Sequence, residues 1–242
     1  MCFKAKAVKK ILATLGPTSL NEKIIKQMDE AGVDMFRVNM THTSVDMLKI
    51  YIRMIQAATE KPICIDSEGS LKRSRVDSFS ERDIKACEIG QKMGITNYAL
   101  SFTNSAKDVW DYRKMLFHED NLISKIETKE GIKNLQKILT SSDEILIDRG
   151  DLSREVDLIN VPTQQIKIIN LAKKEKVPVY VATNFLESMT SSYKPNIAEV
   201  NDAAATLLMG ASGLVLAAET AIGKYPVETV KFVKELIDHY GI

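Results

Sequence analysis

The sequence predicts an α/β protein whose single domain, residues 1–242, is a closed (β/α)8 barrel. Short apolar runs of strand type alternate with longer segments in which apolar residues recur at helical spacing. Eight such strand-then-helix pairs follow one another along the chain. The length of 242 residues is also close to the ~250 that one such barrel occupies. These observations favour a closed TIM barrel over an open doubly wound sheet.

Each predicted strand is a short apolar run. In chain order the runs are Lys10–Thr14, Met35–Asn39, Pro62–Asp66, Asn97–Phe102, Leu122–Glu127, Glu144–Asp151, Pro178–Thr183 and Ser212–Glu219. Four predicted helix starts carry a capping-box pattern, in which a capping residue precedes an acidic residue by three positions. These pairs are Ser19 with Glu22, Ser80 with Asp83, Ser105 with Asp108, and Asn196 with Glu199. Pro226 suits the first turn of the last helix, which is expected to run to the carboxyl terminus.

Composition narrows the classes of function. The chain is 45% hydrophobic and 27% charged with a net charge of +1, so no basic face for nucleic acid is expected. No apolar run approaches the ~20 residues needed to cross a bilayer, and no membrane partner is expected. The three scattered cysteines exclude a disulfide framework and, with a Lys-rich amino terminus that no apolar signal region follows, indicate a cytoplasmic location.

Polar residues mark the ends of the predicted strands. Neither a Gly-x-Gly-x-x-Gly fingerprint nor a P-loop is present, so two common nucleotide-binding motifs are missing. In a barrel of this class, chemistry occurs at the carboxyl ends of the strands. The polar residues there are Arg37, Asn39, Thr41, Asp66, Ser67, Ser101, Lys125, Glu127, Gly150, Asp151 and Thr183.

Lys125 and Glu127 are the most informative pair. They lie two positions apart and therefore share one face of their strand, while Asp151 follows the next strand. Two carboxylates can hold a divalent cation through oxygen, and an ammonium beside them suits stabilisation of an enolate or a phosphoryl group. A simple ion pair on a strand face is the alternative interpretation.

Six motifs resemble the barrel domain of pyruvate kinase. They occur in the family's order and extend over nearly the whole chain. The motifs are Ile11–Ser19, Arg37–His42, Ile123–Glu127, Arg149–Leu152, Ala182–Met189 and Glu219–Pro226. The resemblance implies a barrel enzyme that binds phosphoenolpyruvate, pyruvate or a related 2-keto acid.

The resemblance also implies roles for single residues. Glu127 and Asp151 match ligands of Mg²⁺, which Mn²⁺ can replace, and Lys125 matches the ammonium that stabilises the enolate oxygen and the transferring phosphoryl group. Arg37 and Arg73 resemble arginines on the phosphate side.

Further roles concern a second cation and the substrate. The residues that match a monovalent cation site for K⁺ are Asn39, Thr41, Asp66 and Ser67. The backbone amides of Gly150 and Asp151, with the Thr183 hydroxyl, are expected to hold the substrate carboxylate, and Ser101 is assigned to substrate binding as well.

Several departures from the family concern nucleotide binding. Asp66–Arg73 is followed within a few residues by the helix start at Ser80, so the family's lid domain is not expected, nor is its carboxyl-terminal regulatory domain. Glu68 and Ile222 stand where the family has lysines, and Asp148 stands where it has a small residue. Handling of the enolpyruvate group is therefore favoured over phosphoryl transfer to ADP, and a monomer or dimer over a tetramer.

Three hypotheses follow. The first is a pyruvate kinase-like phosphotransferase or another enolpyruvate-handling enzyme, including a metal-dependent pyruvate aldolase or lyase that uses Glu68 or Asp148 as general base. The second is a catalytically weak subunit that senses the ligand or serves a partner. The third is a structural protein with a decayed site, against which the joint presence of Lys125, Glu127, Asp151 and Thr183 argues.

Overall fold

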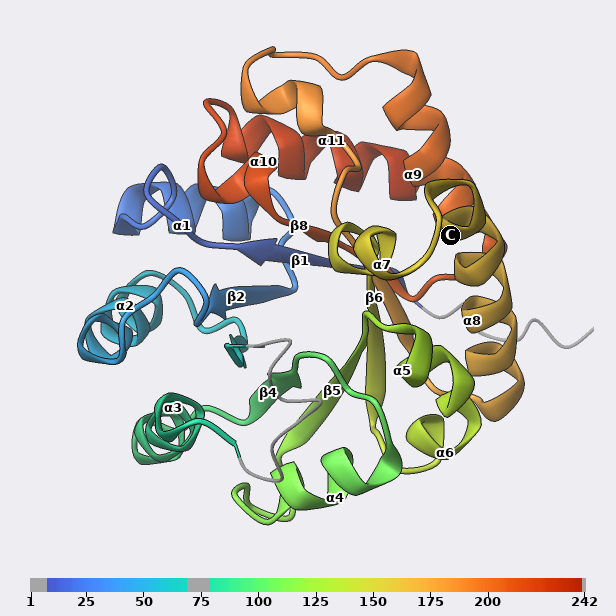
Figure 1. Ribbon diagram of the computed structural model, residues 1–242. Coiled ribbons are helices and arrows are strands. Elements are labelled where there is room, and N and C mark those ends of the chain that lie inside the picture. Colours follow the sequence, from blue (N-terminus) through green and yellow to red (C-terminus); the bar gives the residue numbers. More distant parts are fainter. Residues whose placement is uncertain (1–7, 69–78, 241–242) are drawn as a thin grey trace, which may run out of the picture.

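The structure is a computed structural model that describes residues 8–68 and 79–240. Eight parallel strands form a closed barrel in which each strand pairs with the next and β8 pairs with β1. The strands are β1 (Lys10–Thr14), β2 (Met35–Asn39), β3 (Ile63–Asp66), β4 (Asn97–Leu100), β5 (Asn121–Ile126), β6 (Glu144–Asp148), β7 (Val179–Ala182) and β8 (Gly213–Leu216). Helices surround these strands (Figure 1). The predicted fold class is thus confirmed.

The predictions for β6 and β8 extend three residues too far, and that for β4 extends two residues past Leu100. β6 ends at Asp148 instead of Asp151, and β8 ends at Leu216 instead of Glu219. In both cases a short helix begins almost at once, α7 (Arg149–Glu155) after β6 and α10 (Ala218–Ala221) after β8. The Asp148 side chain accepts a hydrogen bond from the Gly150 amide as the N-cap of α7, which turns the chain out of the strand.

The helices fill the connections between strands. The longer ones are α1 (Glu22–Glu30), α2 (Val45–Ala58), α3 (Glu81–Lys92), α4 (Ala106–Arg113), α8 (Val161–Glu175), α9 (Ile197–Met209) and α11 (Pro226–Tyr240). The shorter ones, besides α7 and α10, are α5 (Lys129–Lys133), α6 (Leu135–Leu139) and the 3-10 helices η2 (Leu158–Asn160) and η3 (Glu187–Thr190). Pro226 opens α11 as predicted.

The cap predictions have mixed outcomes. Ser105 and Asn196 form full capping boxes with Asp108 and Glu199, and Ser80 caps α3 by accepting a hydrogen bond from the Asp83 amide. The Ser19 prediction is wrong, because Asn21 caps α1 while the Ser19 hydroxyl accepts a hydrogen bond from the Gly16 amide in the preceding turn.

Two apolar layers support the barrel. The larger layer lies between strands and helices, and the smaller one fills the barrel interior. The interior layer consists of Leu12, Met35, Cys64, Ala99, Ile123, Leu146, Tyr180, Ala182 and Val215. Side chains two positions further along the strands point to the same interior. The apolar layer is therefore the floor beneath the polar residues at the carboxyl ends.

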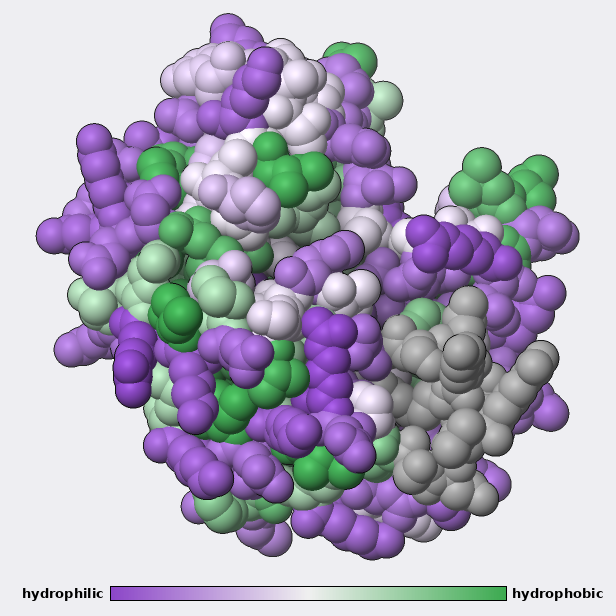
Figure 2. All heavy atoms as spheres, turned by 60° about the vertical axis from the view of Figure 1, so that its left-hand side comes forward, coloured by the Kyte–Doolittle hydropathy of each residue, from purple (hydrophilic) through white to green (hydrophobic). Residues whose placement is uncertain are grey.

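The surface is mainly polar on the face that Figure 2 shows, where hydrophobic side chains form small separate groups. In the two described stretches, no helix is both long enough and apolar enough to cross a bilayer.

The Asn196 cap provides a test of the helix boundaries. Asn196→Ala removes the acceptor for the Glu199 amide, 3.0 Å away, and should lower the free energy of unfolding by about 1 kcal/mol in urea denaturation. Asn160→Ala is the matched control, because Asn160 is the N-cap residue of α8 but makes no side-chain cap hydrogen bond. Equal losses in the two variants would contradict this assignment.

Candidate active site

Lys125 lies at the centre of a buried polar cluster at the carboxyl ends of the strands. It follows the interior residue Ile123 by two positions on β5, so its side chain enters the barrel above the apolar floor. Its ammonium is surrounded by oxygens on β3, β5, β6 and the turn after β4. The distances from Nζ are 3.0 Å to Glu127 Oε1, 3.1 Å to Ser101 Oγ, 3.3 Å to Asp66 Oδ2 and 3.6 Å to Asp148 Oδ2.

These contacts keep Lys125 charged. Burial alone would lower the pKa of the ammonium, but the carboxylates of Asp66, Glu127 and Asp148 outweigh burial and raise the pKa above its ordinary value. Lys125 is therefore a fixed positive charge in a site from which most water is excluded. Such a charge stabilises a developing anion more strongly than an exposed lysine would.

Asp66 organises the neighbouring cations. Its Oδ2 accepts hydrogen bonds from Arg37 at 2.7 Å and from Lys125 at 3.3 Å, and its Oδ1 accepts one from the Ser101 hydroxyl at 3.2 Å. Arg37 also donates from Nε to the Thr14 hydroxyl. Arg37, Lys125 and Ser101, which were predicted as site residues, are thus brought together by one fully buried carboxylate.

One carboxylate oxygen of Glu127 accepts no hydrogen bond from any described residue. Its Oε2 accepts a hydrogen bond from the Phe102 amide, whereas its buried Oε1 accepts none from any described residue although Lys125 Nζ lies 3.0 Å away. Burial raises the pKa of this carboxyl to about 7, against the attraction of Lys125. This buried oxygen is ion-paired with Lys125 but accepts no hydrogen bond from a described residue, so a bound cation could further compensate the cost of burying its charge.

Three carboxylates could hold a metal ion. Ligand atoms of Glu127, Asp148 and Asp151 all lie within 4.8 Å of one another. Carboxylate oxygens are the ligands that Mg²⁺ and Mn²⁺ prefer, and two of the three residues are those predicted from the sequence. The unpaired oxygen of Glu127 supports the fit. Asp148 stands where the family has a small residue, and it was not predicted as a ligand.

Gly150 and Thr183 meet beside this cluster. The Gly150 amide lies 2.9 Å from Thr183 Oγ1 and 3.2 Å from Asp148 Oδ1. Gly150 and Asp151 lie in α7, which lies just beyond β6 (Figure 1), and not at a strand end as predicted. The Gly150 amide and the Thr183 hydroxyl, both predicted to contact the substrate carboxylate, are nevertheless brought together.

Arg149 holds the backbone around Thr183. Thr183 and Asn184 both have positive φ, 72° and 58°, a conformation that is costly for a β-branched residue such as threonine. The Arg149 guanidinium donates to the carbonyls of both residues and lies 4.1 Å from the centroid of the Phe185 ring. Asp202 pairs with the same guanidinium at 2.7 Å. Arg149 begins one of the family motifs, but no role was predicted for it.

The residues of the predicted K⁺ site are only partly associated. Asn39 and Asp66 are register partners on β2 and β3, and the Ser67 hydroxyl accepts a hydrogen bond from the Ser101 amide. Thr41 is exposed, and its amide donates to Asn39 Oδ1. The K⁺ site stays a prediction.

Glu68, which stands where the family has a lysine, forms an ion pair with Arg82. Glu68 Oε1 accepts a hydrogen bond from Arg82 at 2.7 Å, and Arg82 also donates to the carbonyls of Met40 and Thr43. Arg82 thus links the segments that follow β2 and β3. This ion pair engages a carboxylate that the sequence analysis considered as a general base. The predicted Arg73 lies outside the described residues.

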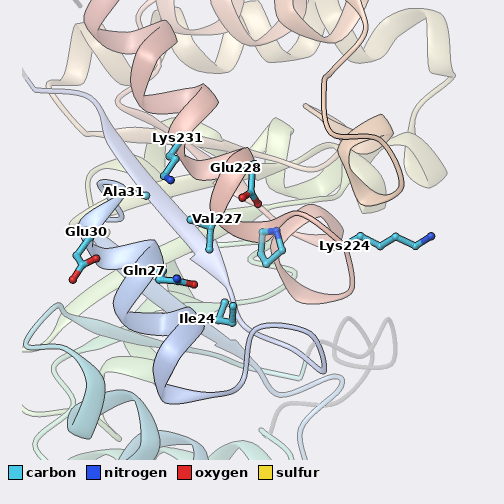
Figure 3. Close-up of a pocket in the computed structure, with 9 residues that line it drawn as sticks. Ile24, Gln27, Glu30, Ala31, Lys224, Val227, Glu228 and Lys231 are labelled. Carbon is cyan, nitrogen blue, oxygen red and sulfur yellow. The ribbon is translucent and has the colours of Figure 1, made fainter.

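A separate pocket lies between α1 and α11. Figure 3 shows Ile24 and Gln27 of α1 facing Val227 of α11 across this pocket. Its lining contains none of the predicted site residues. The chemistry expected of this chain therefore belongs to the carboxyl ends of the strands and not to this pocket.

Comparison with known proteins identifies the family. Residues 64–230 match the family of the pyruvate kinase barrel domain, which is more than half of the 242 residues. The chain belongs to the pyruvate kinase family.

Full-length relatives are considerably longer. A pyruvate kinase of Borreliella burgdorferi is 32% identical over 207 residues, which cover 79% of the chain and 43% of the relative. One of Thermotoga maritima is 39% identical over 164 residues, which cover 66% of the chain and 35% of the relative. One of Thermoplasma acidophilum is 28% identical over 313 residues, which cover 95% of the chain and 58% of the relative. The chain spans about half the length of the pyruvate kinases it matches.

The raised pKa of Glu127 predicts a pH dependence of stability. Between pH 4.5 and about 7 the folded chain keeps a proton on Glu127 that the unfolded chain releases. The free energy of unfolding of the metal-free protein should therefore fall as the pH rises through this window. Glu127→Gln should flatten this fall, measured by urea denaturation in EDTA at several pH values.

The exposed Glu235→Gln is the control and should keep the slope of the native protein. A Glu127→Gln profile that is parallel to the native profile would show that Glu127 does not take up the proton.

Proposed function

We propose that this chain is a Mg²⁺-dependent or Mn²⁺-dependent enzyme that binds phosphoenolpyruvate, pyruvate or a related 2-keto acid and stabilises its enolate. The observation that carries the proposal is the buried Lys125 ammonium, 3.0 Å from the otherwise unpaired Oε1 of Glu127. An enolate oxygen placed there would meet a fixed positive charge in a desolvated setting. Membership in the pyruvate kinase family supports this substrate class.

Lys125 is the proposed catalytic residue. Because its three carboxylate neighbours hold it in the charged form, it stabilises negative charge on the enolate oxygen and does not act as a general base at neutral pH. Asp66 is a positioning residue, since its Oδ2 fixes both Lys125 and Arg37. Arg37 would add positive charge toward a phosphoryl group, as would Arg73.

Glu127 and Asp151 would hold the divalent cation, beside Asp148. Bound there, the cation would act as a Lewis acid toward the carboxylate and keto oxygens of a 2-keto acid. The K⁺ assignment to Asn39, Thr41, Asp66 and Ser67 is retained as part of the proposal.

Contacts to the substrate carboxylate are assigned to Thr183 and α7. The Gly150 amide and the Thr183 hydroxyl converge within 2.9 Å, and Arg149 holds the backbone that orients Thr183. The Asp151 amide and the Ser101 hydroxyl are further proposed contacts. Phosphoryl transfer to ADP is not part of the proposal, because Glu68 contributes a negative charge, paired with Arg82, where the family has a lysine.

Exchange of the pyruvate methyl protons with solvent tests this function. NMR in D₂O with Mg²⁺ should show exchange catalysed by the native chain, in which the methyl proton passes to solvent water while Lys125 stabilises the enolate oxygen. Lys125→Met should slow this exchange by about 10²-fold or more, because the positive charge at the enolate oxygen is lost. Lys224→Met, in the loop before α11, is the control and should leave the rate unchanged.

Two outcomes would contradict the proposal. One is the absence of exchange in the native chain, and the other is an unchanged rate in Lys125→Met. Adding phosphoenolpyruvate and ADP to the same sample then tests for kinase activity, and formation of ATP would add phosphoryl transfer to the function.

A further inference from the structure

The Asp148 carboxylate lies where two donors converge. Asp148 is the last residue of β6, and its side chain is buried. Its Oδ1 lies 3.2 Å from the Gly150 amide, which also donates to Thr183 Oγ1. The same Oδ1 lies 3.2 Å from Thr183 Oγ1, whose single hydroxyl proton has the Ala182 carbonyl as its other acceptor. Asp148 Oδ2 lies 3.6 Å from Lys125 Nζ. One carboxylate thus contacts an amide, a hydroxyl and an ammonium.

These donors are the groups that the proposed function assigns to the carboxylate of the substrate. The Gly150 amide donates a hydrogen bond to Thr183 Oγ1 at 2.9 Å, so the two groups lie side by side. Asp148 Oδ1 lies 3.2 Å from each of them and therefore occupies a position from which one oxygen contacts both.

Charge opposes a second carboxylate at the same place. The Asp148 carboxylate is ion-paired with the Lys125 ammonium, whose Nζ lies 3.6 Å from its Oδ2. A ligand carboxylate beside it would meet a like charge at short range and in a buried setting, where screening by solvent is weak.

We infer that Asp148 determines specificity by competing with the carboxylate of the ligand for the Gly150 amide and the Thr183 hydroxyl. A 2-keto acid can use these donors only when Asp148 releases both of its hydrogen bonds. The inference rests on the proposed function, because that function identifies the two donors as a carboxylate site. It assigns to Asp148 an inhibitory effect on ligand binding and not a catalytic role.

Oxalate is the probe, because it is a planar dicarboxylate that resembles the enolate of pyruvate. The dissociation constant of oxalate would be measured by calorimetry at saturating Mg²⁺. The saturating Mg²⁺ concentration would be determined separately for each variant. Asp148→Ala should bind oxalate about tenfold more tightly or better, since one acceptor that competes for the Gly150 amide and the Thr183 hydroxyl is lost and one like charge is removed. Asp148→Asn should lie between native and Asp148→Ala, because it removes the charge but can keep the acceptor.

Asp157→Asn is the matched control. It removes one negative charge from the exposed residue that precedes η2, without touching the two donors. It should leave the affinity for oxalate unchanged. A gain in affinity in Asp157→Asn as large as that in Asp148→Ala would attribute the effect to net charge and would overturn the inference.

The remaining outcomes distinguish failure of the inference from failure of the proposed function. Native protein that binds oxalate while Asp148→Ala binds it equally or less tightly would overturn the inference and leave the proposed function in place. A loss of affinity in Asp148→Ala at saturating Mg²⁺ would make Asp148 a contributor to binding. Failure of every variant, native protein included, to bind oxalate would remove the proposed function and the inference together.

Discussion

The site depends on the burial of one ammonium among several carboxylates. Lys125 is in contact with Asp66, Glu127 and Asp148, and none of these side chains has ready access to water. Removing one partner from such a buried group leaves an uncompensated charge, which typically costs about 3–5 kcal/mol. The contacts of Lys125 therefore fix the positions of side chains on β3, β5 and β6 relative to one another. Arg37 joins this arrangement through Asp66.

The balance of charge explains why the cluster suits a cation. Among the described residues of the site, four carboxylates face three cationic side chains, which leaves one negative charge when all are ionised. The carboxylates are Asp66, Glu127, Asp148 and Asp151, and the cations are Arg37, Lys125 and Arg154, which pairs with the less buried Asp151. A divalent ion would offset the remaining negative charge of the buried carboxylates. In the metal-free protein, burial raises the pKa of Glu127, and the nearby Asp148 and Asp66 raise it further.

Much of this arrangement could be predicted from the sequence. Alternation of short apolar runs with helical segments predicted the barrel, and two-residue spacing predicted that Lys125 and Glu127 share the interior face. Sequence periodicity did not predict where β6 ends, because the Asp148 side chain caps α7 and moves Gly150 and Asp151 into a helix. The same contact explains why Asp148 was not recognised in the carboxylate cluster. Its role depends on a neighbour 35 positions away, Thr183, whose positive φ no local pattern predicts.

The most direct test of the account is to locate a bound metal ion. Crystals grown with Mn²⁺ and oxalate, measured for anomalous scattering at the manganese edge, should show a peak within coordination distance of carboxylate oxygens of Glu127 and Asp151. A peak at that position would support a cation site beside the Lys125 ammonium. Clear density for the Glu127 and Asp151 carboxylates without an anomalous peak beside them, or a peak only elsewhere in the molecule, would contradict it.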